Sequence, residues 1–298
     1  MGSAYALTTA AGATENAVVR ADRLRLLVEG IVFGEGPRWR DGRLWFSDMH
    51  GEAVHTVDAG GRLDTVVTLR GRRPSGLGFL PDGSLLVVSM LEPEVLRWDG
   101  GRLTLHADLR AMVRDGCNDM VVDARGNAYV GTFPPASDPD GALVLVRPDG
   151  TAAIAAEGLR FPNGCVVTPD GRTLIVAESI GRRFTTFTVA PDGSLTDRRT
   201  FAECAPFGPD GICLDADGAI WAAMTLAREF QRIAPGGEVL DRIAIDDRLA
   251  IAPALGGPDG RTLFLCTARE HDPASLAGTR AATIHAVEVD VPAAAPRR

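Results

Sequence analysis

The 298-residue sequence contains few of the residues and motifs that mark common enzyme sites. Its five cysteines are odd in number and include no C-x-x-C pair, which argues against a disulfide framework and favours a reducing cytoplasm. Its five histidines form no H-E-x-x-H or H-x-H pair. A G-x-S-x-G elbow, a P-loop and a G-x-G-x-x-G after a strand are also absent, so a Ser/His/Asp hydrolase or a nucleotide-binding protein has no support.

Long apolar runs and basic clusters are missing too. No apolar run approaches the roughly 18 residues of a transmembrane helix. The formal net charge is −8 and the basic residues are scattered, which argues against nucleic acid as a partner. The first twenty residues lack the positively charged start of a signal peptide. We therefore predict a cytoplasmic protein with a small-molecule substrate and no membrane partner, in which residues 1–22 are a flexible tail. The sequence does not determine its oligomeric state.

A sixfold repeat is the main feature that the sequence does contain. Each unit has a turn made of Asp-Gly, or Arg-Gly in the third unit, followed by a short apolar run. The six turn glycines are Gly42, Gly83, Gly126, Gly171, Gly218 and Gly260, at intervals of 41, 43, 45, 47 and 42 residues. A period of this size indicates repeated supersecondary units.

The repeat predicts an all-β, six-bladed β-propeller that occupies residues 23–298 as a single domain. In the first unit, Asp41-Gly42 suits a type I′ hairpin, and residues 53–57 and 64–69 form the outer strands. We expect residues 23–28 to pair with a strand at 284–291, because an open ring would leave unpaired edges. Sustained helical periodicity is absent, which excludes an α/β barrel and leaves a β-sandwich or β-helix as the alternative.

One position in each unit is expected to line the central channel. The innermost strand of a propeller blade runs beside this channel, and the loop before the strand opens at one mouth. The residues seven or eight positions before the turn glycines are Glu35, Ser75, Asn118, Asn163, Asp210 and Ala252, and we call them the ring residues. Four of them carry a side-chain carboxylate or amide oxygen. Asn-Gly and Asp-Gly pairs also cap turns, which is the alternative for any one of them.

Two carboxylates and two amides around one axis predict a bound cation. The negative charges would repel one another without it, and all-oxygen ligation favours Ca²⁺, with Mg²⁺, Mn²⁺ or Zn²⁺ as substitutes. A glycine follows several of the ring residues, and we expect it to let the backbone approach the shared centre closely. The side chains of Ser75 and Ala252 offer a cation a weak ligand atom or none, so a substrate is expected to enter beside these two residues.

Several residues near the predicted mouth are open to a structural or a functional interpretation. His50 follows what we expect to be the inner strand of the first unit, where it is either a general base facing a pocket or an ordinary surface or loop histidine. Cys117 and Cys165 flank ring positions, and buried apolar filling is their expected role. Phe133 and residues 224–230 should overhang the mouth and add an apolar, arginine-bearing rim.

Five motifs resemble those of the SMP-30/gluconolactonase/LRE-like superfamily, over about residues 26–290. They are E-G-P-R-W at 35–39, S-G-L-G at 75–78, N-D-M at 118–120, P-N-G at 162–164 and P-D-G-I at 209–212. The resemblance implies a six-bladed propeller whose catalytic cation is held by Glu35, Asn163 and Asp210. It also implies that Asn118 binds the metal or the substrate. Members of this superfamily hydrolyse lactones, and some act on organophosphate esters.

The sequence departs from the family pattern at position 116. Some sugar lactonases carry an arginine there that contacts substrate hydroxyls, whereas this chain has Gly116. The departure argues against aldonolactone specificity but leaves the metal ligands in place.

The sequence therefore predicts a metal-dependent lactonase. The cation would polarise the lactone carbonyl, and Asp210 would orient or deprotonate the attacking water, with Asn118 as the second catalytic residue. Ser75, His50 and Phe133 are the expected substrate contacts. Two alternatives remain open at this point. The same metal site would serve isomerisation, cyclisation or organophosphate ester hydrolysis, or the propeller would be a non-catalytic platform for protein binding.

Overall fold

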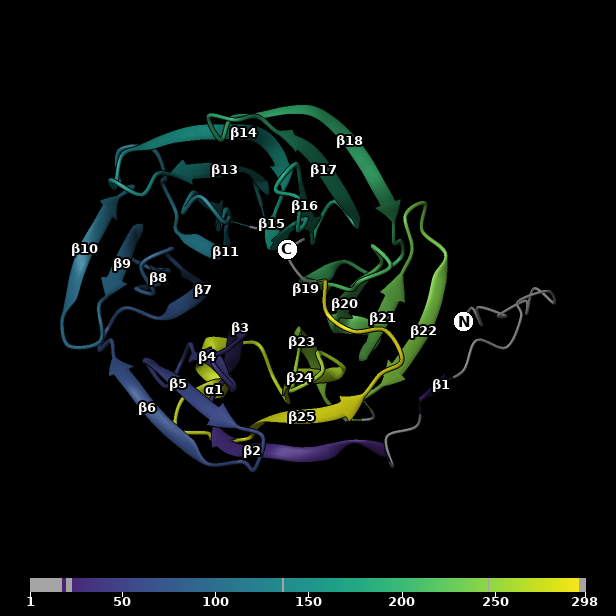
Figure 1. Cartoon of the computed structure of the whole chain (residues 1–298). Helices are drawn as coiled ribbons and strands as arrows, with labels where there is room; N and C mark the ends of the chain where they lie inside the picture. Colours follow the sequence, from purple (N-terminus) through teal and green to yellow (C-terminus); the bar gives the residue numbers. More distant parts are fainter. Residues whose placement is uncertain (1–17, 20–22, 136, 246, 295–298) are drawn as a thin grey trace, which may run out of the picture.

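The computed structural model describes residues 18–19, 23–135, 137–245 and 247–294. Six β-sheets surround a central channel as the blades of a propeller (Figure 1), which confirms the prediction of an all-β, six-bladed fold. The predicted tail, residues 1–22, lies outside the described residues apart from β1 (Val18–Val19), which pairs in parallel with β22 (Val239–Ala244). In the described part of the chain, no helix has the length and apolar character needed to cross a membrane.

Each blade has four antiparallel strands, to which blade 5 adds the parallel strand β1. In blades 1 to 5 these four strands follow one another in the chain with the innermost strand first, whereas blade 6 takes its outermost strand from the N-terminal end. Blades 1 and 2 consist of β3 (Gly34–Arg40), β4 (Arg43–Asp48), β5 (Ala53–Asp58), β6 (Leu63–Thr68), β7 (Pro74–Phe79), β8 (Leu85–Ser89), β9 (Glu94–Trp98) and β10 (Leu103–Asp108). Blades 3 and 4 consist of β11 (Cys117–Val122), β12 (Ala128–Thr132), β13 (Asp140–Val146), β14 (Ala152–Arg160), β15 (Pro162–Val167), β16 (Thr173–Glu178), β17 (Arg183–Val189) and β18 (Leu195–Glu203).

Blades 5 and 6 complete the ring. Blade 5 contains β19 (Pro209–Leu214), β20 (Ile220–Met224), β21 (Glu229–Ile233) and β22, with the 3-10 helix η2 (Thr225–Ala227) between β20 and β21. Blade 6 contains β23 (Leu249–Gly256), β24 (Thr262–Ala268), β25 (Ala282–Glu288) and β2 (Arg25–Ile31), with the short helix α1 (Pro273–Leu276) between β24 and β25.

The ring is closed by strands from opposite ends of the sequence. β2 pairs antiparallel with β25, with Arg25 opposite Ala286 and Val28 opposite Ile284. This confirms the predicted pairing. Because β2 covers the edge of β25, blade 6 reaches the same four-stranded width as blade 1.

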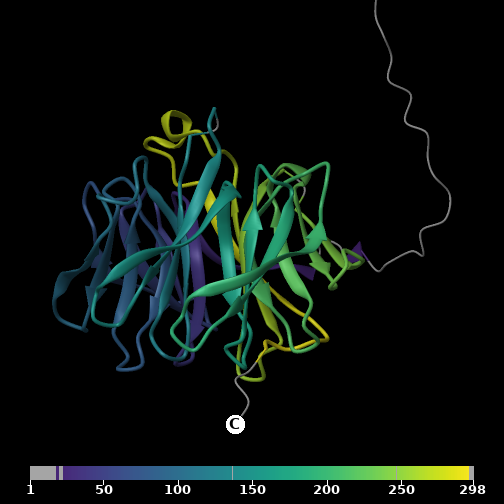
Figure 2. The same cartoon turned by 90° about the horizontal axis from the view of Figure 1, so that it is seen from above.

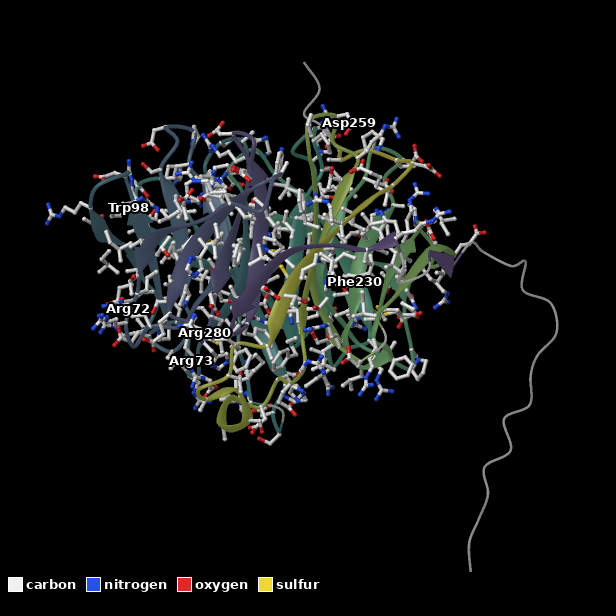
Figure 3. The ribbon with its side chains drawn as sticks, turned by 90° about the horizontal axis from the view of Figure 1, so that it is seen from below. Arg72, Arg73, Trp98, Phe230, Asp259 and Arg280 are labelled. Atoms are coloured by element: carbon white, nitrogen blue, oxygen red, sulfur yellow. The ribbon has the colours of Figure 1, made fainter. Side chains whose placement is uncertain are left out.

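The predicted type I′ hairpin occurs at the first turn, where both Asp41 (φ 51°) and Gly42 (φ 75°) have positive φ. In the other five turns the glycine alone has positive φ. Leu80 shows the reason, because its N–H donates to Ser84 O and its carbonyl accepts from Gly83 N, which makes a longer loop than a two-residue turn. These hairpins lie on the face opposite α1. Figure 3 shows Asp259, in the hairpin of blade 6, on the far side from the helix.

The apolar core is divided among the six interfaces between adjacent blades. At the interface of blades 3 and 4, for example, Tyr129 and Leu143 pack with Leu174, Val176 and Phe187. Each of the remaining interfaces between adjacent blades contains an equivalent cluster of buried apolar residues. The apolar runs that follow the turn glycines supply the second strands and much of this core, since both faces of each inner sheet are buried.

The glycines that follow ring residues lie against the innermost strand of the next blade. A Cβ on Gly164 would lie 2.5 Å from Ile212 N and 2.7 Å from Gly211 Cα, both in the innermost strand of the next blade. Gly76 and Gly211 have the same close contact with their own neighbouring strands. These glycines therefore let innermost strands pack closely against one another.

We expect Gly164→Ala to lower the free energy of unfolding by about 2 kcal/mol, because the atoms that the new methyl group meets belong to the backbone and must be displaced. Urea denaturation of the purified protein measures the change. Gly101→Ala is the matched control, since its Cβ would approach only Asp99 Oδ1, at 3.9 Å. Equal stability of the two variants would contradict this account of the inner strands.

Candidate active site

Five of the six ring residues occupy one structural position, the second residue of an innermost strand. They are Glu35 in β3, Ser75 in β7, Asn118 in β11, Asn163 in β15 and Asp210 in β19. Each of these strands is interrupted by a bulge at or next to that residue. A bulge redirects a side chain away from the regular alternation of a strand. Adjacent innermost strands contact one another all the way round the ring, so the five residues share one mouth of the channel.

The carboxyl groups of this mouth lie close enough to repel one another. Burial raises the pKa of Glu35, and the charges of Asp210 and Asp119 raise it further. Burial and the charge of Asp119 also raise the pKa of Asp210, against hydrogen bonds from Thr225 and Asn163 that lower it. The Thr225 hydroxyl lies 3.2 Å from Asp210 Oδ2. Blades 1, 3 and 5 thus each contribute a carboxyl group to a single cluster, in which Glu35 and Asp119 are buried and Asp210 is half-buried.

The two asparagines use their amide nitrogens to join neighbouring blades. Asn118 Nδ2 donates to Pro162 O at 3.2 Å, and Asn163 Nδ2 donates to Ser179 Oγ at 3.2 Å. Ser179 Oγ in turn donates to Pro209 O at 2.7 Å. With the nitrogens engaged in this way, the amide oxygens of both side chains are available to a ligand in the channel.

The remaining two ring residues differ from each other. Ser75 is fully buried, and its hydroxyl has no hydrogen-bond partner among the described residues. Ala252 is the fourth residue of β23, and its Cβ occupies the place where a side chain on Gly211 would extend, 2.5 Å away. Ala252 therefore fills the contact between blades 5 and 6. Entry of a substrate beside Ser75 and Ala252 stays a prediction.

The donors of this mouth suit a hard divalent cation. In the described ranges, no three His, Cys, Asp or Glu side chains are arranged to hold a metal ion, so a complete set requires asparagine oxygens. Glu35 supplies a buried carboxylate and Asp210 a half-buried one, and Asn118 and Asn163 supply neutral oxygens. Carboxylate and amide oxygens are the ligands that Ca²⁺ and Mg²⁺ prefer.

Asp119 and Arg38 are two residues of this region to which the sequence analysis assigned no role. Asp119 directly follows a ring residue, at a position where four other blades have glycine. This exception to the repeat is the sequence signal that could have identified Asp119 as part of the site. Arg38 reaches from β3 to β11, where Nη2 lies 3.1 Å from Asp119 Oδ1 and 2.5 Å from Met120 O. Burial raises the pKa of Asp119, whereas the Arg38 guanidinium lowers it.

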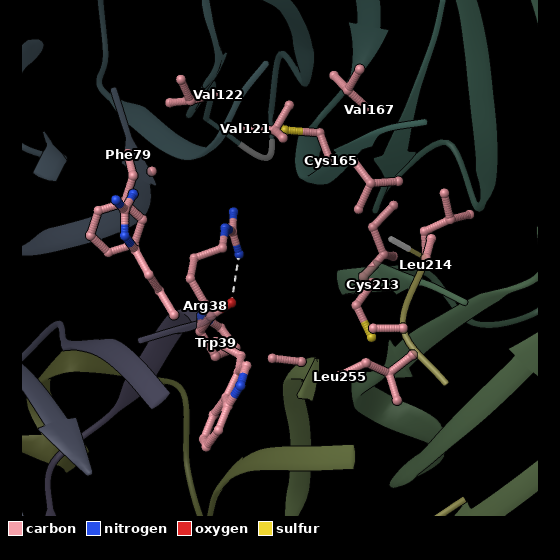
Figure 4. A pocket seen from close by; sticks show the side chains of 18 of the residues that line it. Arg38, Trp39, Phe79, Val121, Val122, Cys165, Val167, Cys213, Leu214 and Leu255 are labelled. Carbon is pink, nitrogen blue, oxygen red and sulfur yellow. Dashed lines mark hydrogen bonds between the residues drawn. The ribbon is translucent and has the colours of Figure 1, made fainter. Parts of the chain in front are cut away.

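A cavity of about 640 Å³ opens at the opposite mouth of the channel. It is lined by the second halves of the innermost strands, and Figure 4 shows Arg38 extending into it among Phe79, Val121 and Cys213. The Arg38 guanidinium therefore stands between this cavity and the carboxyl cluster. The cavity is separate from the predicted metal ligands.

His50 and Phe133 lie around the ring mouth rather than in it. His50 packs edge-on against Phe33, with centroids 5.8 Å apart, and lines a cavity of about 450 Å³ with Arg73 and Arg280. Burial and the charge of Arg73 lower the pKa of His50. Phe133 packs against Phe161 at 5.1 Å in an edge-to-face contact. Their roles in substrate binding stay predictions.

The cysteines have the apolar role that was expected. All five are free thiols, and Cys117 and Cys165 are buried. Burial raises the pKa of Cys117 to about 12, so its reactive thiolate form is suppressed.

Comparison with known proteins points to lactonases. A family model described as the SMP-30/Gluconolactonase/LRE-like region matches residues 33–269. A 6-deoxy-6-sulfogluconolactonase from Pseudomonas putida is 27% identical over 80% of this chain and 84% of its own length. A pentonolactonase from Haloferax volcanii is 29% identical over 82% of this chain and 84% of its own length. The crystal structure of regucalcin, a calcium-binding protein from Agrobacterium tumefaciens, shares the fold, with a TM-score of 0.78, 24% identity, and coverage of 92% of this chain and 97% of that one.

Proposed function

The chain belongs to the SMP-30/gluconolactonase/LRE-like family, and from this premise we propose that it hydrolyses a lactone with the help of one divalent cation, Ca²⁺ being the first candidate. The observation that carries the proposal is the cluster of mutually repelling carboxyl groups, buried or half-buried, at the ring mouth. Such a cluster is costly unless a positive charge lies among its members. The lactonase names of the two curated relatives support the reaction class.

Glu35, Asn163 and Asp210 would hold the cation, with Asn118 beside them. When bound, a divalent cation supplies Lewis-acid polarisation of an ester carbonyl. The protein itself holds the carboxylates of Glu35 and Asp210 in position. Glu35 is kept in place by Gly36 N, which donates to its Oε2 at 3.1 Å, and Asp210 is kept in place by Thr225.

Asp210 is the residue best suited to act on the attacking water. Its carboxylate would accept a proton from the water as the water oxygen adds to the carbonyl carbon. The ring C–O bond then breaks, and the departing alkoxide takes the proton to give a hydroxy acid. Asn118, whose nitrogen is engaged by Pro162 O, presents its oxygen to a substrate hydroxyl or to the cation. The unpartnered Ser75 hydroxyl is a further candidate contact for the substrate.

Removal of divalent ions tests the proposal. We expect a chelator to abolish lactone hydrolysis and to lower the free energy of unfolding by about 3 kcal/mol relative to protein at 100 times the ion's Kd, since the ion binds only the folded chain. Turnover is followed with a pH indicator across a lactone panel, and stability by thermal unfolding.

Re-addition of Ca²⁺, Mg²⁺, Mn²⁺ or Zn²⁺ in separate samples identifies the effective ion. Full activity after exhaustive chelation, with no metal found by elemental analysis, would rule out the metal-dependent reaction. A filled metal site without turnover of any lactone would instead favour another reaction at the same site.

A further inference from the structure

Exposed apolar side chains gather at the loops around the ring mouth. Antiparallel topology puts every connection between second and third strands on the α1 face, together with the segments that lead into the innermost strands. Figure 2 shows α1 projecting from this face, away from the C-terminal end. Of the large apolar side chains exposed in the described part of the chain, Leu91, Phe133, Ile180, Phe207 and Leu226 belong to these loops. The others, Leu26, Leu63, Leu105 and Ile154, lie on outermost strands.

Blade 5 connects this apolar surface directly to the ring. Leu226, 66% exposed, follows Thr225, whose hydroxyl donates to Asp210 Oδ2. Phe207, 40% exposed, precedes Asp210 by three residues. Both apolar side chains are therefore anchored by backbone that also fixes a predicted metal ligand.

Blades 3 and 4 provide the same arrangement around Asn163. Ile180, 38% exposed, follows Ser179, which accepts from Asn163 Nδ2. Phe161 precedes Asn163 by two residues and packs against Phe133. Phe161 has a φ of 62°, a conformation that is strained for a residue with a side chain, and its backbone N–H donates to Pro139 O at 2.8 Å. We call Phe133, Phe161, Ile180, Phe207 and Leu226 the apolar rim.

The other half of the mouth has a contrasting character. Blades 1, 2 and 6 surround it with His50, Arg73 and Arg280, which line one cavity together with Glu52. Figure 3 shows Arg73 and Arg280 together on the α1 face. Leu91, in the blade 2 loop, is the exception among the exposed large apolar side chains of this face, and the apolar rim itself lies on the side of the ring that holds Asn163 and Asp210.

Gly116 has no side chain that could offer a substrate a polar contact beside the apolar rim. Gly116 has a φ of 152°, and a Cβ there would lie 2.7 Å from Met90 O and 3.5 Å from Phe133 Cβ. Phe133 N also donates to Gly116 O at 2.8 Å, which holds the aromatic residue over this glycine. A side chain able to bind substrate hydroxyls has no room at this place, and an aromatic side chain lies beside it.

We propose that the apolar rim binds an apolar substituent of the substrate, so that the preferred lactone carries an alkyl or aryl group and few hydroxyls. This inference rests on the proposed lactone hydrolysis and adds a substrate class to it. Apolar surface that is exposed next to a small polar site is typical of ligand pockets. Each buried CH₂ contributes about 0.8 kcal/mol, which is roughly a fourfold gain in kcat/KM.

Three six-membered lactones with the same reacting group test the proposal. They are δ-valerolactone, δ-decalactone, which carries a pentyl substituent, and D-glucono-1,5-lactone. We expect the wild-type protein to prefer δ-decalactone over δ-valerolactone by more than about tenfold in kcat/KM, mainly through KM. Leu226→Ser and Ile180→Ser are each expected to reduce this preference by about fivefold. Leu105→Ser is the matched control, because Leu105 is 54% exposed but lies on the outer strand β10, and it should leave the preference intact.

The outcomes separate the two proposals. Hydrolysis of δ-valerolactone and the gluconolactone with no advantage for δ-decalactone, or a preference that survives both rim substitutions, overturns the role of the apolar rim and keeps the lactonase. If no lactone is turned over, lactone hydrolysis fails, and calorimetric binding decides on the rim. If wild-type protein binds δ-decalactone more tightly than δ-valerolactone and Leu226→Ser loses this difference, the role of the apolar rim is supported. Equal binding of the two lactones by the wild-type protein rejects that role.

Discussion

Asp210→Asn is expected to lower kcat/KM for lactone hydrolysis by at least about 100-fold, and Glu35→Gln by a similar factor. The amide introduced by Asp210→Asn would neither accept a proton from water nor bring a negative charge to the cation. Asp210 and Glu35 belong to different blades, but their carboxyl groups lie in one cluster and both are proposed metal ligands. We therefore expect each change to weaken metal binding as well. Initial rates at saturating metal, with bound metal quantified in each variant, separate lost chemistry from lost metal.

Asp259→Asn is the control for these variants, because Asp259 is an exposed carboxylate in a hairpin on the opposite face. It should retain wild-type turnover. Near-normal rates for both Asp210→Asn and Glu35→Gln would remove the ring residues from the reaction, whatever their effect on bound metal.

Arg38→Met is expected to lower the free energy of unfolding by about 3 kcal/mol, the largest loss of stability that we predict for a single residue. The Asp119 side chain is 6% exposed, and Arg38 is the cation that pairs with it. Met retains much of the apolar stem but leaves the Asp119 carboxylate buried without an ion-pair partner. Urea denaturation of metal-free protein gives the change directly.

The double variant Arg38→Met/Asp119→Asn tests the reason for that loss. An asparagine side chain at this position still accepts from Met120 N, which now donates to Asp119 Oδ1 at 2.8 Å, but it carries no charge. We therefore expect the double variant to recover most of the stability that Arg38→Met loses. A double variant as unstable as Arg38→Met would mean that Arg38 acts through packing and its bond to Met120 O.

The sequence predicted the propeller because its signals are local and repeated. Each turn glycine and the apolar run behind it, as at Gly171 and β16, report on a hairpin that needs no distant partner. The common offset from those glycines also located the ring residues, since every blade places its innermost strand in the same way. A feature that recurs once per blade is therefore visible in one sequence.

Contacts made once between distant blades were not predictable in this way. Arg38 and Asp119 meet across 81 positions, and neither the charge nor the spacing of these residues identifies the other. Thr225 and Ser179 come from connections whose course depends on the folded blades. The bulges were missed because an extra residue in one strand appears only when its partner strand is aligned.

The pairing of β2 with β25 has a consequence for how the protein is made. On the ribosome, β2 emerges early, yet its partner is complete only when residue 288 has been synthesised. Blades 1 to 5 can stack in order as they emerge, but the last blade must wait for both strands. Glu35 follows β2 closely in sequence, whereas Asp210 is translated much later, so the carboxyl cluster cannot assemble on a half-finished chain. Contacts of such long range slow folding. A nascent chain arrested before β25 would therefore leave the outer edge of β24 and the strand β2 unpaired and would lack a closed ring.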